Sequence, residues 1–366
     1  MRIHRWLLLA VFLLSYTITI KSTPPPLPTC SPTEIDAAVA ATGSYTPSSL
    51  VDFVRVEGQG FALGDKPYFV RGFNYYPARY PWRRFLTETD DETLRHDFAQ
   101  FSTMGVNTLR IFLWHQALFF CPGSVNVPNA TGFHRLDMVM RLAAEYNLRL
   151  IVTLHDMPDL DVYPLYSDTE YHQRERDFII ARYRDEAAVL AWDVRNEGDI
   201  DYGTHYAIPA KFDKTAVIMW LDRTVKQVRA LDSRHLVTAG WLFDAQSTAP
   251  YVDFVSFHHW TAADELAGRI APIRAVTDQP ILLEEVGYST LHVRGDEQAT
   301  LLNEVVNTST QAGLAGWLVW TAYDFSFDRS CYPSPCESPH NGEHYFGMWD
   351  VNGAAKPVLA IISAAP

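Results

Sequence analysis

The 366-residue chain is short of positive charge, with 30 lysine and arginine residues against 43 aspartate and glutamate residues and a formal net charge of −13 at pH 7. It contains no basic block, no zinc-type spacing of Cys and His, and no glycine loop that would cradle a phosphate. Nucleic acids and anionic membrane surfaces need clustered lysine and arginine, so both are excluded as the main partner. The charge balance favours a neutral partner.

Long apolar runs are also missing, except near the start. The basic residues MRIHR precede an apolar run over residues 6–20, which is short for a membrane span and typical of a signal peptide. No clean cleavage site follows, so residues 1–21 are expected to be either a signal peptide or an uncleaved N-terminal anchor. We therefore expect an extracytoplasmic protein, secreted or anchored by this segment, which meets a membrane only there.

Cysteine is scarce, with four residues in the whole chain. In an exported protein, four cysteines allow up to two disulfides and three pairings. Cys331 and Cys336 flank the short segment YPSP, which a disulfide could pin. The preferred connectivity is therefore Cys331–Cys336 with Cys30–Cys121.

What the chain has in abundance is a repeated order of apolar strand, loop and amphipathic helix. Residues 22–48 are rich in Pro, Ser and Thr and are predicted to be a linker, with the catalytic domain over residues 49–366 opening on a β-hairpin. Eight apolar segments then form a single βα series, which predicts an α/β protein with one (β/α)8 TIM barrel. The predicted strands are 69–75, 106–113, 148–154, 189–196, 235–240, 253–259, 280–286 and 316–321, with helices at 92–105, 134–147 and 214–232.

The active site of such a barrel lies at the carboxyl ends of its strands. Polar and aromatic residues that close the predicted strands are therefore expected to converge on one pocket. By position alone these are Asn74, Arg110, His155, Asn196, Glu197, His258, Glu285 and Trp320. Two carboxyl groups in one pocket are what glycosidic-bond cleavage needs, because one protonates the leaving oxygen while the other attacks or activates water.

The sequence around the two glutamates resembles a known family. WDVRNEG at the fourth strand and LLEEVG at the seventh are similar to the acid/base and nucleophile motifs of the clan A glycoside hydrolases, most nearly glycoside hydrolase family 5, which is cellulase- and mannanase-like. The resemblance covers roughly residues 50–362 and includes NTLRIF, VTLHD and GWLVWTAYDF. It implies a retaining mechanism, with the two carboxyl groups about 5 to 5.5 Å apart.

The resemblance also assigns roles to the two glutamates. Glu197 would be the general acid and later the general base, with a pKa raised by burial and by the charge of Glu285. Glu285 would be the ionised nucleophile, with Arg110 as its hydrogen-bond donor. Glu284 competes for this role, but adjacent strand residues face opposite sides, so Glu284 is expected to turn toward the helical layer.

The remaining strand-end residues are expected to bind substrate: Asn74, His155, Asn196, His258 and Trp320, the last as the platform under the sugar. Structural roles stay open for four of them: Asn196 could cap the next helix, the two histidines could be polar core residues, and Trp320 could pack in the core. Trp260 stands where the family commonly has a tyrosine that touches the nucleophile; its indole can stack or donate but supplies no phenol, and Tyr288 is a candidate substitute. Some further aromatic residues are expected to line outer subsites, among Tyr76, Trp82, Trp114, His115, Trp241 and Tyr323.

The sequence thus predicts a retaining glycoside hydrolase that cleaves β-glycosidic bonds in a polysaccharide or oligosaccharide of the β-mannan or β-glucan type. The two carboxyl groups do the proton and covalent work, so we expect no metal and no cofactor. A monomer is expected. Two alternatives stay open on the sequence alone: a catalytically silent carbohydrate-binding barrel, and a transglycosylase of the same fold.

Overall fold

The computed structural model describes residues 27–124, 127–158, 160, 165–166, 169–203, 210–327 and 341–364. Its centre is a sheet in the order β8-β7-β6-β5-β4-β12-β11-β10-β9, in which all neighbouring strands are parallel. The strands are β4 (Val70–Asn74), β5 (Thr108–Phe112), β6 (Arg149–Thr153), β7 (Val189–Asp193), β8 (Leu236–Thr238), β9 (Gly240–Trp241), β10 (Val255–His259), β11 (Ile281–Val286) and β12 (Gly316–Val319). Only Ala239 separates β8 from β9, so these two are one interrupted strand, and the sheet closes as a barrel of eight.

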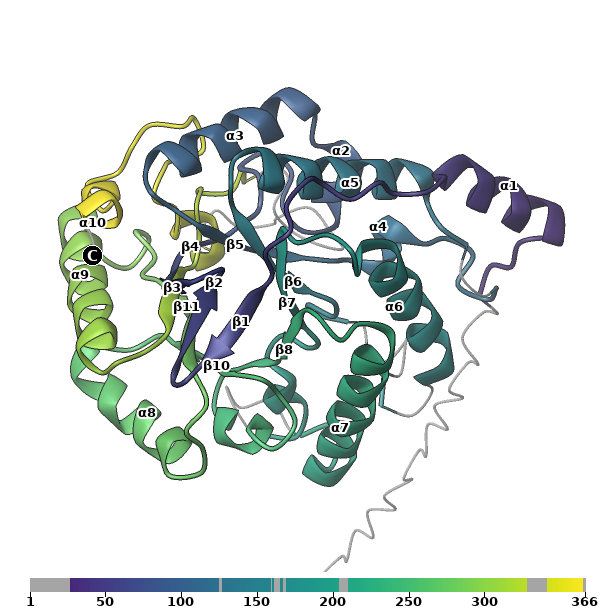
Figure 1. The fold of residues 1–366 in the computed structure, drawn as a ribbon. Coiled ribbons are helices and arrows are strands. Elements are labelled where there is room, and N and C mark those ends of the chain that lie inside the picture. The colour runs from purple at the N-terminus through teal and green to yellow at the C-terminus, as the bar shows by residue number, and fades with distance from the viewer. Residues whose placement is uncertain are drawn as a thin grey trace, which may run out of the picture.

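The helices surround this barrel (Figure 1). The α-helices are α1 (Pro32–Thr42), α2 (Phe85–Glu88), α3 (Asp91–Thr103), α4 (His115–Leu118), α5 (Ala130–Glu145), α6 (Thr169–Tyr183), α7 (Lys214–Leu231), α8 (Leu266–Arg274), α9 (Gly295–Gln311) and α10 (Leu359–Ala364). Short 3-10 turns are η1 (Trp82–Arg84), η2 (Gly198–Asp201), η3 (Ala245–Thr248), η4 (Ala263–Glu265) and η5 (Gly342–Tyr345). The (β/α)8 prediction is confirmed, with all eight strands at the expected places.

The alternation of strand and helix follows from burial. Every residue of β5, β6, β7 and β11 is buried, as expected for parallel strands with side chains on one side in the barrel and on the other under the helices. Helix α3 buries Leu94, Phe98 and Phe101, whose spacing places them on one face, and Asp90 caps its start by accepting from the Thr93 amide at 2.7 Å.

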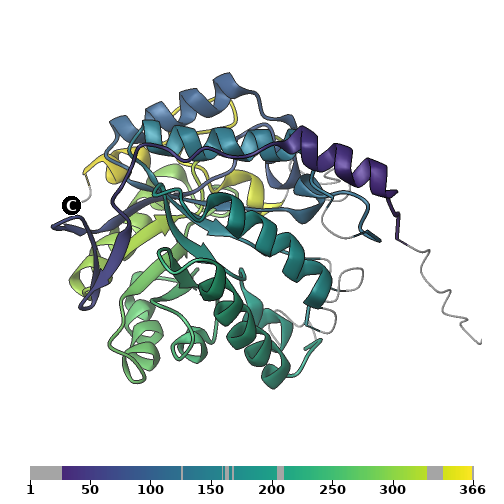
Figure 2. The same cartoon turned by 45° about the vertical axis from the view of Figure 1, so that its right-hand side comes forward.

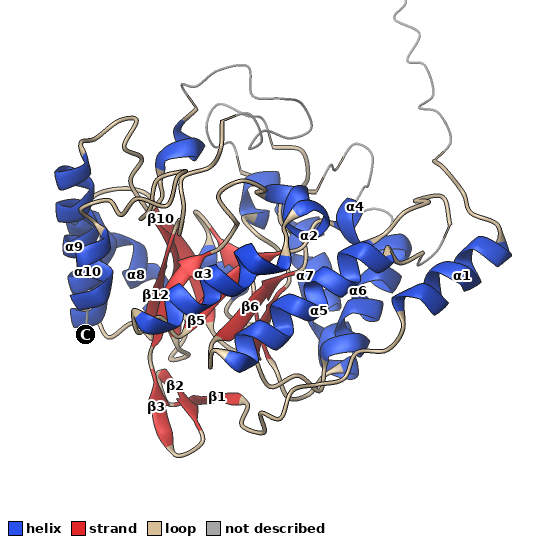
Figure 3. Ribbon diagram, turned by 90° about the horizontal axis from the view of Figure 1, so that it is seen from above, coloured by secondary structure: helices blue, strands red, loops and turns tan. Residues whose placement is uncertain are grey.

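A small antiparallel sheet closes the amino-terminal end of the barrel. It contains β1 (Val54–Glu57), β2 (Gly60–Leu63) and β3 (Lys66–Tyr68), the first two forming the predicted hairpin. Figure 3 shows this sheet at the opposite end from the long loops that follow the barrel strands. Val54 and Phe61 pack with barrel residues such as Leu190 and Phe254 in a second apolar cluster. The amino-terminal end is therefore plugged, and the open end is where the strand carboxyl termini lie.

The N-terminal segment differs from its prediction. Part of the expected linker, over residues 32–42, is helix α1, which packs beside α5 (Figure 2). A capping box explains its start, because Ser31 and Glu34 satisfy each other's backbone amides and proline occupies the first turn. This Pro- and Ser-rich segment is therefore partly helical and not an extended linker.

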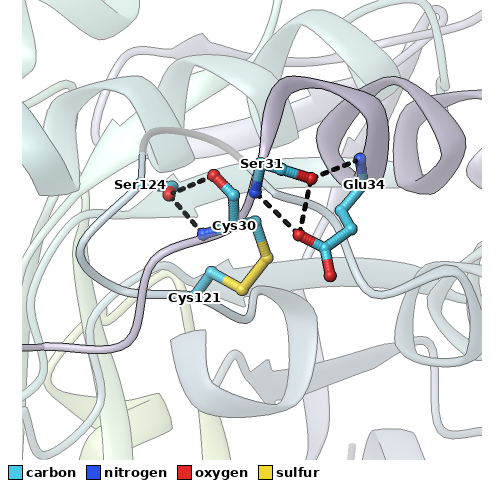
Figure 4. Close-up of a disulfide and its surroundings, with 5 residues drawn as sticks. All are labelled: Cys30, Ser31, Glu34, Cys121 and Ser124. Carbon is cyan, nitrogen blue, oxygen red and sulfur yellow. Dashed lines mark hydrogen bonds between the residues drawn. A yellow bond between two sulfur atoms is a disulfide. The ribbon is translucent and has the colours of Figure 1, made fainter.

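A disulfide between Cys30 and Cys121 ties this segment to the barrel, as predicted (Figure 4). Ser124 supports it, since its hydroxyl accepts from the Cys30 amide at 2.7 Å. The second predicted pair, Cys331–Cys336, and the predicted signal peptide or anchor over residues 1–21 lie outside the described residues. Within the described ranges, the helices are too short or too polar to cross a membrane.

Candidate active site

A cavity of about 640 Å³ opens at the carboxyl end of the barrel. Both predicted carboxyl groups lie in its wall, and they come from the ends of β7 and β11. The lining residues are Trp82, Asp156, Met157, Asn196, Glu197, Trp260, Glu285, Gly287, Tyr288, Ser289, His292, Val293, Trp320, Glu343 and Phe346. The cavity is rich in aromatic side chains with a few acidic groups, which is the composition that sugar rings and their hydroxyls require.

Glu197 and Glu285 meet at His258. The imidazole Nδ1 lies 2.9 Å from Oε1 of Glu197 and 3.5 Å from Oε2 of Glu285. One oxygen of each carboxyl group and one nitrogen of His258 all lie within 4.8 Å of one another. The backbone of Glu197 adopts a left-handed conformation (φ 47°), and its amide donates to Gly240 O at 2.6 Å. A non-glycine residue in this region is strained and is held there by its surroundings, a feature that clusters at functional sites.

Arg110 holds Glu285 in place and binds the neighbouring polar side chains. Its guanidinium donates to Glu285 Oε1, as predicted, and to Asp193 Oδ2 at 2.6 and 3.1 Å. It also donates to Oδ1 of Asn74 at 3.1 Å and to Oδ1 of Asn196 at 2.8 Å. Arg110 is fully buried, so these bonds replace its hydration. Its planar fork fixes four side chains relative to one another, which come from β4, β11 and β7 with the segment after it.

Glu284 does not face the helical layer, so this prediction is wrong. Its side chain is fully buried inside the barrel, with Oε2 3.7 Å from Nε of Arg110 and 3.9 Å from Nε2 of His258. The cause is a β-bulge: Leu283 pairs with Phe257 and Glu285 pairs with His258, so Glu284 is an extra residue and the alternation of faces is broken.

Space for the extra carboxylate comes from a missing side chain. A Cβ at Gly240 would lie 2.1 Å from Oε2 of Glu284, so only glycine fits there. Three carboxylates therefore surround His258, those of Glu197, Glu284 and Glu285. Although burial opposes its charged form, these three groups raise the pKa of His258 to about 10.

The two catalytic candidates ionise unequally. Burial opposes the charge on Glu197, but the hydrogen bond from His258 and the charges of Arg110 and Arg195 hold the pKa of Glu197 below its usual value. Burial raises the pKa of Glu285 to about 7, opposed by His258 and Arg110 and assisted by Glu197. The predicted raised pKa of Glu197 is therefore wrong, because His258 donates to this carboxylate. Groups this close titrate as a pair, which holds one proton over the pH range between its two ionisations.

The other predicted site residues divide into three groups. Asn196, Trp260 and Trp320 line the cavity with the carboxyl groups. Asn74 is buried below it, where its side chain accepts from Arg110 and donates to Glu284 O at 2.8 Å, so it supports the site without facing a ligand. His155 is not in the cavity lining; its ring lies beside His115 and His172 in a neighbouring cavity.

The aromatic candidates divide in the same way. Trp82 lines the cavity, stacked on Trp320 with ring centroids 6.1 Å apart. Trp114 and His115 line the neighbouring cavity, while Tyr76, Trp241 and Tyr323 are buried. Tyr288 does line the cavity, but its hydroxyl donates to Thr261 O at 2.7 Å and therefore does not replace the expected phenol at the nucleophile.

Two acidic residues of the cavity were missed by sequence reasoning. Asp156 accepts from Nδ2 of Asn196 at 3.2 Å, and burial raises its pKa to about 6. Glu343 accepts from Nε1 of Trp320 at 3.2 Å, and burial raises its pKa to about 7. Asp156 directly follows a strand-end residue, so its position was a usable signal. Glu343 lies in the short turn η5 after the last strand, where no periodicity marks it.

Comparisons with known proteins agree with this architecture. The family model described as Cellulase (glycosyl hydrolase family 5) matches residues 71–326. Mannan endo-1,4-beta-mannosidase A of Aspergillus aculeatus is 24% identical over 356 residues, covering 80% of this chain and 86% of that protein. The protein of the same name from Podospora anserina is 26% identical over 330 residues, covering 73% and 81%.

Solved structures show the same fold at lower sequence identity. The endo-1,4-beta-mannanase from Rhizomucor miehei has a TM-score of 0.62 and 19% identity, covering 85% of this chain and 97% of that one. The GH5_18 protein from Streptomyces cattleya in complex with GlcNAc has a TM-score of 0.67 and 17% identity, covering 81% and 80%. Because the family model matches well over half of the sequence, this chain belongs to family 5 of the clan A glycoside hydrolases and is a glycoside hydrolase.

Proposed function

We propose that the enzyme hydrolyses the β-1,4-mannosidic bonds of a mannan with retention of configuration, through Glu197 and Glu285. The observation that carries this proposal is the proximity of the two carboxyl groups, whose nearest oxygens lie within 4.8 Å at the wall of one cavity. Retaining enzymes hold the two groups about 5 to 5.5 Å apart, whereas inverting enzymes leave about 6.5 to 9.5 Å for a water molecule. The sugar is chosen from the relatives named mannan endo-1,4-beta-mannosidase.

In the first step, protonated Glu197 gives its proton to the glycosidic oxygen as the bond from that oxygen to the anomeric carbon breaks. The carboxylate of Glu285 attacks the same carbon from the opposite face and forms a glycosyl ester. Arg110 donates to Glu285 and keeps the attacking oxygen oriented. The reactive form is the one in which Glu197 carries the single proton of the pair.

In the second step, Glu197 acts as the base. It removes a proton from water, the water oxygen attacks the anomeric carbon, and the ester bond to Glu285 breaks to restore the free carboxylate. His258 contacts both carboxyl groups and is cationic at neutral pH, so it stabilises whichever of them is negatively charged in each step.

The cavity wall supplies groups to hold the sugar. Trp320 and Trp82 offer aromatic faces, and Trp260 packs against Phe346 in the same lining, with ring centroids 5.6 Å apart. Asn196, oriented by Arg110, presents its amide to a hydroxyl next to the anomeric carbon. The axial and equatorial hydroxyls of a sugar are distinguished by such fixed polar groups rather than by the aromatic surfaces.

The test is hydrolysis of β-1,4-mannan and of β-1,4-glucan by the wild-type enzyme and by Glu285→Gln, with Glu92→Gln as the control because Glu92 is exposed on α3. We expect mannan cleavage in the wild type and the control, none in Glu285→Gln, and a first product of β configuration by proton NMR. A first product of α configuration would contradict the mechanism, and cleavage of glucan but not mannan would contradict the substrate.

We also propose that the enzyme works outside the cytoplasm. The Cys30–Cys121 disulfide supports this, since such bonds persist in oxidising compartments. The basic and apolar N-terminal residues support export in the same way.

A further inference from the structure

A second cavity, of about 290 Å³, lies beside the catalytic one. The two share Asp156 and Met157 in their walls, so residue 156 marks the boundary between them. Three histidines line the second cavity: His115, His155 and His172. None of the three has a role in the hydrolytic mechanism described above.

The three histidines come from different parts of the barrel and converge. His115 begins α4 after β5, His155 follows β6, and His172 lies in the first turn of α6. Their ring centroids are 4.7 Å apart for His115 and His155, 5.5 Å for His115 and His172, and 5.7 Å for His155 and His172. One ring nitrogen of each lies within 4.8 Å of the other two.

The environment of His155 is the main evidence for a ligand in this cavity. Its side chain is 1% exposed, and neither of its ring nitrogens has a hydrogen-bond partner among the described residues. A buried polar atom without a partner is costly, and a native structure rarely tolerates one without a reason. A neutral imidazole without a hydrogen-bond partner keeps a lone pair for coordination.

Glu175 completes the arrangement from one side. Its Oε2 accepts from Nδ1 of His115 and lies 3.8 Å from Nδ1 of His172. A metal-bound histidine usually donates its second ring N–H to a carboxylate. This hydrogen bond orients the ring and makes the nitrogen that faces the metal a better ligand. The positive charge of the neighbouring Arg176 is directed elsewhere, since its guanidinium donates to Asp177 and Gln227.

We propose that His115, His155 and His172 bind one divalent transition-metal ion, Zn²⁺ in the first instance, with Glu175 as the supporting carboxylate. Imidazole nitrogens suit zinc, copper and nickel, and zinc binds them at about 2.0 to 2.1 Å. On binding, the rings close in and Nε2 of His115 exchanges its present contact, Leu154 O at 3.0 Å, for the ion. These ligands are far apart in the chain, so no short spacing of residues marks the site.

The ion would hold α4, the end of β6 and the start of α6 together. It sits apart from Glu197 and Glu285, so it takes no part in bond cleavage. Its effect on the catalytic site would pass through the chain from His155 to Asp156, which contacts Asn196. Zn²⁺ binding at these histidines does not depend on whether the substrate of the enzyme is mannan.

The experiment is a calorimetric titration of Zn²⁺ into the full chain, prepared without a polyhistidine tag and stripped with a chelator. We expect one Zn²⁺ per chain and at least a tenfold loss of affinity in His155→Gln and in His172→Gln. His134→Gln is the matched control, because His134 is exposed on α5 and should leave the affinity unchanged. Circular dichroism establishes that each variant is folded. If one of the two histidine variants fails to fold, the other still tests the proposal.

The catalytic trio of Glu197, His258 and Glu285 also groups possible metal donors, so the titration is repeated in Glu285→Gln. The proposal requires that this variant still bind Zn²⁺ as the wild type does. It is overturned if the wild type binds no Zn²⁺, or if binding is lost in Glu285→Gln and kept in the histidine variants. Equal weak binding by all variants, including His134→Gln, would also overturn it as adventitious surface binding. A Co²⁺-loaded wild type should show the intense visible absorption of a tetrahedral site that His172→Gln lacks.

Discussion

Replacing Glu284 by glutamine removes one negative charge from beside Arg110 and His258, close to the Glu197–Glu285 pair, and keeps the shape of the side chain. The lost charge lies 3.7 Å from Nε of Arg110 and 3.9 Å from Nε2 of His258. Neither carboxylate oxygen of Glu284 has a hydrogen-bond partner in the part of the chain that the structure describes. The substitution therefore acts through charge and not through a lost hydrogen bond.

The size of the effect follows from these distances. Coulomb's law with an effective dielectric constant of about 20 gives about 4 kcal/mol for unit charges 3.9 Å apart, which corresponds to about three pH units. Spreading of both charges over two atoms reduces this to about one to two units. His258, whose pKa the surrounding carboxylates raise to about 10 against the effect of burial, should titrate lower by that amount.

The same lost charge changes the catalytic pair. Burial raises the pKa of Glu285 to about 7, and removing a nearby negative charge makes its proton easier to lose. His258 stays protonated at this pH in the variant, so it does not compensate. We expect the alkaline limb of kcat/KM to move to lower pH by about half a unit to one unit in Glu284→Gln.

The assay is kcat/KM on an activated aryl β-mannoside from pH 4 to pH 9.5, together with the imidazole ¹⁵N shifts of His258 over the same range. Glu92→Gln is the control, since it removes an exposed charge from α3. Thermal unfolding establishes that Glu284→Gln is folded. A folded variant whose alkaline limb and His258 titration coincide with those of the wild type would refute this reasoning.

Three further predictions concern the same molecule. The wild-type kcat/KM should depend on pH as a bell-shaped curve with its alkaline limb near pH 7. The two carboxyl groups must keep one proton between them, and they lose it as the pH rises through the raised pKa of Glu285. A flat profile from pH 5 to 9 would contradict this. Glu197→Ala should slow substrates with poor leaving groups about 10² to 10⁴ times more than activated aryl glycosides, and equal losses on both would exclude Glu197 as the acid. Replacing Cys30 and Cys121 by serine should lower the free energy of unfolding in urea by about 4 to 5 kcal/mol, because the disulfide closes a separation of 91 residues, while an unchanged midpoint would show that the segment adds no constraint.

The barrel and its site could be predicted because both follow from two simple regularities. Apolar strands in a single βα series fixed the eight strand positions within a few residues, as at 281–286 against a predicted 280–286. The rule that strand carboxyl ends meet at one face then brought Glu197, Asn196, Glu285 and Trp320 into one cavity.

The errors have local physical causes. Strict alternation failed at Glu284, because a bulge opposite Phe257 and His258 inserted one extra residue, and bulges leave no mark in residue periodicity. Strand-end position placed His155 with the catalytic residues, but the packing of its ring against His115 and Trp220 turned it into the neighbouring cavity.

Two predictions from charge and from composition also failed, because local geometry decided the outcome. The pKa order of the carboxyl pair depends on which of them takes the hydrogen bond from His258, and a sequence does not contain that geometry. The helix over residues 32–42 depends on the cap formed by Ser31 and Glu34 within a segment whose composition is typical of a linker.

The central claim is that Glu285 attacks the sugar while Glu197 handles the proton. Incubation with a 2-deoxy-2-fluoro β-mannosyl fluoride, which forms the glycosyl ester quickly and loses it slowly, followed by proteolysis and mass spectrometry, tests it most directly. We predict one fluoroglycosyl label per chain, attached to Glu285, with inactivation in step with labelling. A label on Glu284 or Glu197, or turnover with no label at all, would contradict it.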